Sequence, residues 1–157
     1  MATIRVPKVR FPVLATLLAA VGMAAQGCRA EEGRDVRYDP SPPAVVERML
    51  ELGDAASADV MYDLGSGDGR IVVAAARDFG VQRAIGVEID RELIARARRN
   101  AKEAGVAGNT RFVRADLFQH DFSDAELVTL FILPALNLRL RPRLLSGLEP
   151  GTRVVSH

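Results

Sequence analysis

The stretch Tyr62-Asp63-Leu64-Gly65-Ser66-Gly67-Asp68-Gly69-Arg70 predicts the fold more strongly than any other part of the chain. An apolar run, residues 60–64, precedes its glycines and is expected to form a short buried strand. A second apolar run, residues 71–79, follows it and is expected to form a helix that ends at Gly80. Glycines at alternate positions let the backbone turn sharply and approach a ligand closely. This order predicts a ligand-binding turn, with a plain strand-to-helix turn as the alternative.

The rest of the chain alternates between strand patterns and helix patterns. Further strands are expected at residues 84–88, 111–115 and 127–133, and a fifth begins at Val154 and Val155. Helices are expected around residues 45–52 with Ser41 as the cap, at 91–104 with Asp90 as the cap, and at 136–145, where Pro142 should distort or end the helix. This alternation predicts an α/β fold, a Rossmann-like doubly wound parallel sheet.

Acidic residues stand where two further predicted strands end, and ligands of such sheets bind at the carboxyl ends of the strands. Glu88 ends the second strand, where its carboxylate can accept a bidentate hydrogen bond from two ribose hydroxyls. Asp116 follows the third strand, where it can accept from an adenine amino group while Leu117 covers the ring. The alternatives are an exposed strand-end charge for Glu88 and a helix cap or turn residue for Asp116.

The glycine-rich turn also indicates the charge of the ligand. A dinucleotide-binding turn has a third glycine at the position that Arg70 occupies, and its pyrophosphate would be repelled by Asp63 and Asp68. Carboxylates suit a cationic ligand without phosphate. S-adenosylmethionine has a sulfonium, an ammonium and no phosphate, and it is therefore the predicted cofactor. A nicotinamide-dependent oxidoreductase is the disfavoured alternative.

The motif from Asp63 to Gly69, together with Glu88 and Asp116, resembles the first three cofactor motifs of class I S-adenosylmethionine-dependent methyltransferases. Tyr38-Asp39-Pro40-Ser41-Pro42 and Leu130-Phe131-Ile132-Leu133-Pro134 resemble a narrower group, which contains small bacterial enzymes and membrane-anchored mitochondrial protein-lysine methyltransferases. The resemblance covers about residues 36–157. One departure is Pro40-Ser41-Pro42, where the group usually has Pro-Thr-Pro.

The resemblance implies that the chain transfers a methyl group from S-adenosylmethionine to an acceptor, for which a protein lysine is one candidate. The implied cofactor-binding residues are Tyr38, Asp63, Gly65, Ser66, Gly67, Asp68, Gly69, Glu88, Asp116 and Leu117. Leu133 and Pro134 are implied to contact the acceptor. No catalytic base is predicted. The alternative function is a non-catalytic domain that binds S-adenosylmethionine or a nucleoside.

A class I methyltransferase sheet has a sixth and a seventh strand, whereas this sequence stops at His157, just after the predicted fifth strand. The methyltransferase domain, residues 40–157, is therefore expected to be truncated at its C-terminal end. An open sheet edge favours association with other chains. We expect the chain by itself to be marginally stable or self-associating.

The N-terminal residues resemble an export signal. Three of the 21 basic residues lie in residues 1–10, and an uncharged, mostly apolar run follows at 11–25. Its length suits the core of a signal peptide better than a membrane span, and it lacks the polar face of a mitochondrial presequence. Cys28 after Gly27 resembles a bacterial lipidation site. Residues 1–28 are predicted to be a signal peptide, a lipoprotein signal or a membrane anchor, with a linker at 29–39 and a location at the cell envelope or a membrane.

Composition excludes several other classes of protein. A hydrophobic content of 48% and a charged content of 26% are typical of a globular protein. The net charge is +1, and without its basic N-terminal residues the chain is slightly acidic, so no nucleic-acid partner is indicated. The lone cysteine excludes an intrachain disulfide, and the presence of just two histidines argues against a metal site.

Overall fold

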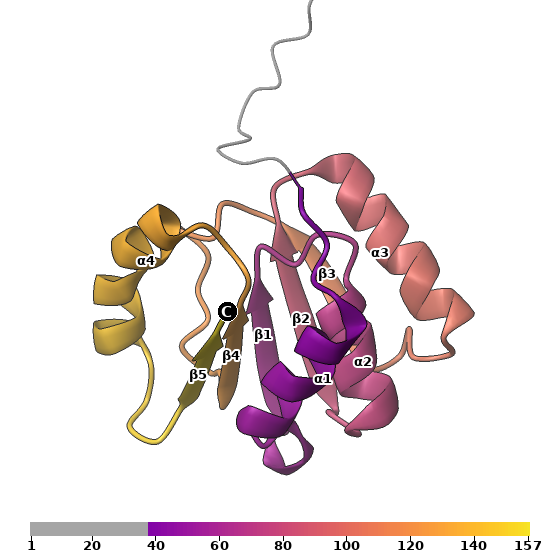
Figure 1. The fold of residues 1–157 in the computed structure, drawn as a ribbon, viewed down its shortest axis with the longest axis horizontal. Helices are drawn as coiled ribbons and strands as arrows, with labels where there is room; N and C mark the ends of the chain where they lie inside the picture. Colours follow the sequence, from indigo (N-terminus) through magenta and orange to yellow (C-terminus); the bar gives the residue numbers. More distant parts are fainter. Residues whose placement is uncertain (1–37) are drawn as a thin grey trace, which may run out of the picture. The chain divides into compact units, whose positions relative to one another are not determined.

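The computed structural model describes residues 38–157 (Figure 1). The expectations for residues 1–28, including lipidation at Cys28, and for the linker as far as residue 37 lie outside these residues and stay predictions. Within the described part of the chain, no helix is long and apolar enough to cross a membrane.

A five-stranded parallel sheet forms the centre of the fold, in the order β3-β2-β1-β4-β5 (Figure 1). The strands are β1 (Val60–Leu64), β2 (Arg83–Glu88), β3 (Thr110–Arg114), β4 (Leu127–Leu130) and β5 (Arg153–Ser156). The chain first builds outward from β1 to β3 and then returns to the other side of β1 with β4. This reversal creates a switch point between β1 and β4, where doubly wound sheets bind their ligands. The predicted Rossmann-like parallel sheet is confirmed.

In the described part of the chain, four helices cover the two faces of the sheet. They are α1 (Pro43–Leu52), α2 (Arg70–Asp78), α3 (Arg91–Glu103) and α4 (Pro134–Gly147), and a short 3₁₀ turn (Ala55–Ser57) follows α1. Apolar side chains of α1, α2 and α3 share one core cluster with Met61, Phe112 and Leu127 of the sheet. The other face has a second cluster, in which Leu140 of α4 joins Leu64 and Val128. Alternate residues of each strand thus serve opposite faces, as the pleat requires.

Ser41 does not cap α1 as the sequence predicted. The N-cap residue is Pro42, and no side chain caps the helix. Prolines near the start of the helix lack backbone N–H groups, so a serine hydroxyl there has fewer amide donors from which to accept a hydrogen bond. The predicted cap of α3 is confirmed, because Asp90 accepts hydrogen bonds from the amides of Glu92 and Leu93 at 2.7 and 3.2 Å.

The second half of the chain differs from two expectations, the length of one strand and the end of one helix. β4 ends at Leu130, three residues earlier than expected, because its neighbour β1 ends at Leu64, the partner of Leu130. Pro142 lies inside α4 without ending it, and the helix continues to Gly147. Leu140 and Leu144, on either side of the proline, both pack into the second core cluster. We attribute the continuation of the helix to this packing.

The start of α2 lies closely against two neighbouring elements. Gly69, its N-cap, has φ +77°. A Cβ atom there would lie 2.6 Å from Cε1 of Phe112 in β3 and 2.8 Å from Cβ of Ala97 in α3. The turn after β1 therefore needs glycine at this position both for its backbone conformation and for its packing.

This double requirement predicts a steric cost that can be measured against a matched control. Gly80 has nearly the same φ, +74°, but no atom lies within 4 Å of the Cβ position. Gly80→Ala should lower the free energy of unfolding by about 1–2 kcal/mol, the cost of left-handed backbone alone. Gly69→Ala should cost about 1–3 kcal/mol more, because the added methyl also overpacks the core. Urea unfolding of both variants tests this, and equal losses would contradict it.

Candidate functional site

A cavity of about 320 Å³ opens at the carboxyl ends of the strands, beside the switch point. Nine of the ten predicted cofactor-binding residues line it: Tyr38, Asp63, Gly65, Ser66, Gly67, Asp68, Glu88, Asp116 and Leu117. Gly69, the tenth, lies outside the lining and shapes the turn behind it. The segment after β4 contributes Phe131 and Ile132, and α4 contributes Leu136 and Arg139, none of which was predicted as a site residue.

Backbone hydrogen bonds hold the glycine-rich loop, residues 65–69, to β2. The amides of Gly65 and Ser66 donate to the carbonyl of Val87 at 2.9 and 3.1 Å. The amide of Gly67, whose φ is +54°, donates to Glu88 Oε2 at 2.9 Å. A Cβ atom on Gly67 would lie 2.6 Å from Cε2 of Tyr38, so the tyrosine ring lies directly against the loop.

Asp63 is a buried carboxyl with one oxygen free. Its Oδ1 accepts a hydrogen bond from the hydroxyl of Thr129 at 2.8 Å, and the two residues are register partners in β1 and β4. Its Oδ2 is buried without a hydrogen-bond partner among the described residues. Burial, reinforced by the charges of Glu88 and Asp68, raises the pKa of Asp63 to about 7, although the bond from Thr129 opposes the shift.

Sequence reasoning missed Thr129. It predicted this strand as an almost wholly apolar run, and the run contains one hydroxyl. That single polar residue in a buried strand was the available signal, because a buried hydroxyl needs a partner. Its partner follows from the parallel register, which places residue 129 opposite residue 63.

Glu88 supports the loop and also faces the cavity. Its Oε1 accepts from the amides of Ile89 and Asp90 at 2.8 and 2.9 Å, and its Oε2 accepts from Gly67. A carboxylate oxygen has two acceptor sites, so Oε2 can accept one further hydrogen bond without any rearrangement. A bidentate bond to two ribose hydroxyls, as predicted, would have to displace or share a backbone amide.

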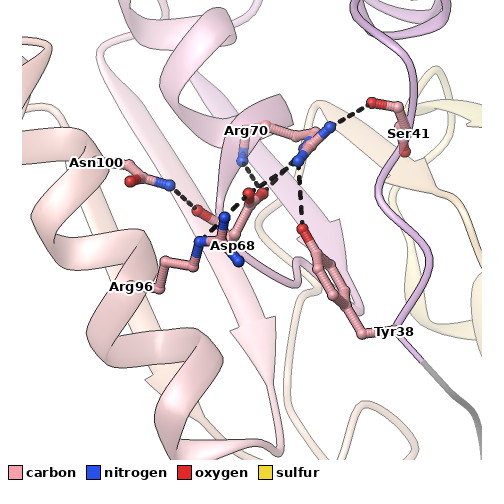
Figure 2. A network of polar contacts seen from close by, with 6 residues as sticks. All are labelled: Tyr38, Ser41, Asp68, Arg70, Arg96 and Asn100. Atoms are coloured by element: carbon pink, nitrogen blue, oxygen red, sulfur yellow. Dashed lines mark hydrogen bonds and ion pairs between the residues drawn. The ribbon is translucent and has the colours of Figure 1, made fainter.

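Asp68 is engaged by an arginine. Its two oxygens accept from Nε and Nη2 of Arg70 at 3.0 and 2.9 Å (Figure 2). Burial would raise the pKa of Asp68, but the hydrogen bonds and charge of Arg70 prevail and hold it below its usual value. The charge of Asp68 is therefore largely neutralised within the protein. Of the two loop carboxyls that favoured a cationic ligand, it is Asp63 that has a free oxygen.

Asp116 lies at the cofactor site, as predicted, but its carboxylate also has the role given as the alternative, that of a turn residue. It lines the cavity, yet its Oδ1 accepts from the amide of Phe118 and its Oδ2 from the side chain of Gln119, both at 2.9 Å. It is thus a turn residue, and its predicted bond to an adenine amino group stays a prediction. Leu117 and Phe118 present an apolar surface beside it that suits an aromatic ring.

The two predicted acceptor residues lie at the start of α4, next to the cavity but outside its lining. Leu133 is the N-cap residue and is 49% exposed, and Pro134 begins the helix. Phe131 and Ile132, immediately before them, form the cavity wall. The acceptor role of Leu133 and Pro134 stays a prediction.

The residues present fit S-adenosylmethionine. Asp63 Oδ2, a buried oxygen without a partner among the described residues, belongs to a cavity-lining residue and offers a place for the ammonium end of the ligand. Glu88 offers an acceptor for a ribose hydroxyl, and Leu117 and Phe118 offer a surface for the adenine. When bound, this cofactor supplies an electrophilic methyl group.

Comparison with known proteins agrees with this geometry. The family model of the ANTKMT methyltransferase domain matches residues 63–157. The chain belongs to this methyltransferase family. A protein-lysine N-methyltransferase of Saccharolobus islandicus is 48% identical over 78% of this chain and 76% of its own length. The adenine nucleotide translocase lysine N-methyltransferase of Mus musculus is 40% identical over 77% of this chain and 52% of its own length.

Solved structures show the same architecture. The crystal structure of an RNA methyltransferase from Salinibacter ruber, in complex with S-adenosylhomocysteine, is 56% identical with a TM-score of 0.72, over 75% of this chain and 76% of that one. The chain spans about half the length of its animal relatives. It is a class I methyltransferase whose cofactor is S-adenosylmethionine.

The buried carboxyl of Asp63 predicts that this methyltransferase binds its cofactor in a pH-dependent way. An ammonium beside Oδ2 favours the ionised carboxylate, so the affinity for S-adenosylhomocysteine should fall by about tenfold between pH 8 and pH 6 as Asp63 protonates. Asp63→Asn should bind more weakly and show little of this pH dependence. Calorimetric titrations at pH 6, 7 and 8 measure both, and the same pH dependence in the variant would contradict the assignment.

The same carboxyl should make the stability of the cofactor-free fold fall as the pH rises, whereas it makes the affinity for the cofactor increase. Because the folded protein raises the pKa of Asp63 from 3.8 to about 7, the fold favours the protonated form. Without cofactor, the stabilising contribution of this group is therefore fully present below pH 4 and is lost as the pH rises through about 7. Asp63→Asn should remove this pH dependence of the stability, because an amide does not ionise, and denaturant unfolding without cofactor at several pH values measures it.

Proposed function

We propose that this methyltransferase transfers the methyl group to the side-chain amine of a protein lysine. The observation that carries the proposal is the charge of the cavity. Its lining contains six acidic residues, Asp39, Asp63, Asp68, Glu88, Asp90 and Asp116, and two basic ones, Arg70 and Arg139. An excess of carboxylates attracts a cationic side chain and repels the phosphates of a nucleic acid. The relatives from Saccharolobus islandicus and Mus musculus, both named as lysine methyltransferases, support the same acceptor.

Asp39 has the most suitable place for an acceptor among these carboxylates. It lies in the segment before α1, lines the cavity and is exposed. Unlike Asp63, Asp68 and Glu88, it makes no hydrogen bond or ion pair with another described residue. We propose that Asp39 attracts the lysine ammonium and accepts a proton from it, since the neutral amine alone has the lone pair that attacks the methyl group.

The remaining contribution of the protein is orientation. Methyl transfer is an in-line displacement, so the amine nitrogen must approach the methyl carbon from the side opposite the carbon–sulfur bond that breaks. Phe131, Ile132 and Leu136 line the cavity on the side of α4, where they can hold the aliphatic part of a lysine and exclude water. This arrangement needs no further acid or base.

The name of the Salinibacter ruber relative raises RNA as a second candidate acceptor, and one experiment separates the two. The protein is incubated with S-adenosylmethionine labelled in its methyl group, together with either poly-L-lysine plus a total-protein extract or total RNA. Label recovered as methyllysine after acid hydrolysis supports the proposal. Label recovered in RNA, with none in protein, would contradict it.

Asp39→Asn tests the mechanism on the same substrate. Loss of the carboxylate should lower kcat/KM for poly-L-lysine by at least about a hundredfold, the usual lower range for a general base. The affinity for S-adenosylhomocysteine should change by less than about twofold, because the acceptor and not the cofactor has lost its partner. Asp59→Asn, an exposed acid outside the cavity lining, is the control. Equal activity of Asp39→Asn and the control would show that Asp39 has no such role.

A further inference from the structure

A single guanidinium connects the segment before α1 to the glycine-rich loop. Arg70 donates through Nη1 to the carbonyl of Ser41 at 2.7 Å and through Nη2 to the hydroxyl of Tyr38 at 3.3 Å (Figure 2). The same side chain donates through Nε and Nη2 to the carboxylate of Asp68. Arg70 thus holds three groups, two from the segment and one from the loop.

Few hydrogen bonds hold the segment, residues 38–42, in place. It has no regular secondary structure, and prolines at positions 40, 42 and 43 remove backbone donors. Outside the first turn of α1, two hydrogen bonds from Arg70 join the segment to the rest of the described chain, and the hydroxyl of Tyr38 also interacts with the carboxylate of Asp68. Tyr38, Asp39, Pro40 and Ser41 nevertheless form one wall of the cavity. Arg70 is the residue that binds this wall at two points, Tyr38 and Ser41, so the position of the wall depends strongly on Arg70.

The loop itself has independent supports. Glu88 accepts from the amide of Gly67 at 2.9 Å, and Asn100 donates to the carbonyl of Asp68 at 2.9 Å. Arg96 also lies 4.0 Å from the carboxylate of Asp68, so the loop retains a second basic neighbour (Figure 2). Loss of the contacts from Arg70 to Tyr38 and Ser41 should therefore free the wall and leave the loop in place.

We propose that Arg70 is a positioning residue of the cofactor site, which holds residues 38–41 against the glycine-rich loop so that Tyr38 closes the cavity over Gly67. The planar fork of arginine is essential to this role, because it points donors at the carboxylate, the carbonyl and the hydroxyl at once. Lysine would keep the charge beside Asp68, but its single ammonium cannot span all three acceptors. Arg70 occupies the position at which dinucleotide-binding loops have glycine, and here that position has a role of its own.

Four variants of the full chain test the proposal: Arg70→Lys, Tyr38→Ala, the double variant that combines them, and Arg77→Lys. Arg77 lies on the same helix in an exposed ion pair with Asp78 and serves as the matched control. The measurements are the Kd for S-adenosylhomocysteine by calorimetry and the urea midpoint of the cofactor-free protein. Arg70→Lys and Tyr38→Ala should each raise the Kd by about tenfold, because each frees the same wall. Arg77→Lys should leave it unchanged.

The double variant distinguishes positioning from general stabilisation. If Arg70 acts through Tyr38, the double variant should bind about as weakly as either single variant. The urea midpoint of Arg70→Lys should stay close to that of the wild type. Any one of three results would overturn the proposal. These are wild-type affinity in Arg70→Lys, losses of affinity that multiply to about a hundredfold in the double variant, and a loss of affinity in Arg70→Lys that accompanies an equal loss of stability.

Discussion

Between β1 and α2 the backbone passes through three residues with left-handed φ, Gly65, Gly67 and Gly69. This path keeps side chains out of the turn, so parts of the chain that are distant in sequence can lie against it. Tyr38 contacts the loop from the segment before α1, Phe112 from β3 and Ile132 from the segment after β4. Tyr38 and Ile132, which line the cavity, can approach the loop closely because Gly67 and Gly65 have no Cβ atoms to push them away. The bonds from the loop amides to Val87 and Glu88 then fix the loop at the end of β2.

Charge decides which ligand such a cavity can hold. Asp63 places a carboxyl in a fully buried position, where an ion without a partner is costly. Thr129 satisfies one oxygen, Arg70 neutralises the neighbouring Asp68, and Oδ2 of Asp63 is left for a ligand. A cationic cofactor stabilises this arrangement and a pyrophosphate destabilises it. The electrostatics therefore agree with membership of a methyltransferase family and explain why the loop, despite its glycines, is unsuited to a dinucleotide.

The sheet could be predicted because its evidence is local: each buried strand is an apolar run, and each helix has its own periodicity and its own start and stop residues. Nine of the cavity-lining residues could be predicted from equally local evidence, since Asp63 lies within, Glu88 ends and Asp116 closely follows such a run. Contacts between distant parts of the chain could not. The bond from Thr129 to Asp63 depends on the register between β1 and β4, and the bonds from Arg70 to Tyr38 and Ser41 depend on where α1 lies. The continuation of α4 through Pro142 likewise depends on tertiary packing, which local propensity does not report.

The central claim is that the cavity recognises a nucleoside cofactor with a cationic amino-acid end and rejects one with a pyrophosphate. Calorimetric titration of the wild-type protein with S-adenosylhomocysteine and, in parallel, with NAD tests this claim most directly. The account predicts one saturable site for S-adenosylhomocysteine and no saturable heat for NAD at the same concentration. Saturable binding of NAD, with none of S-adenosylhomocysteine, would contradict it.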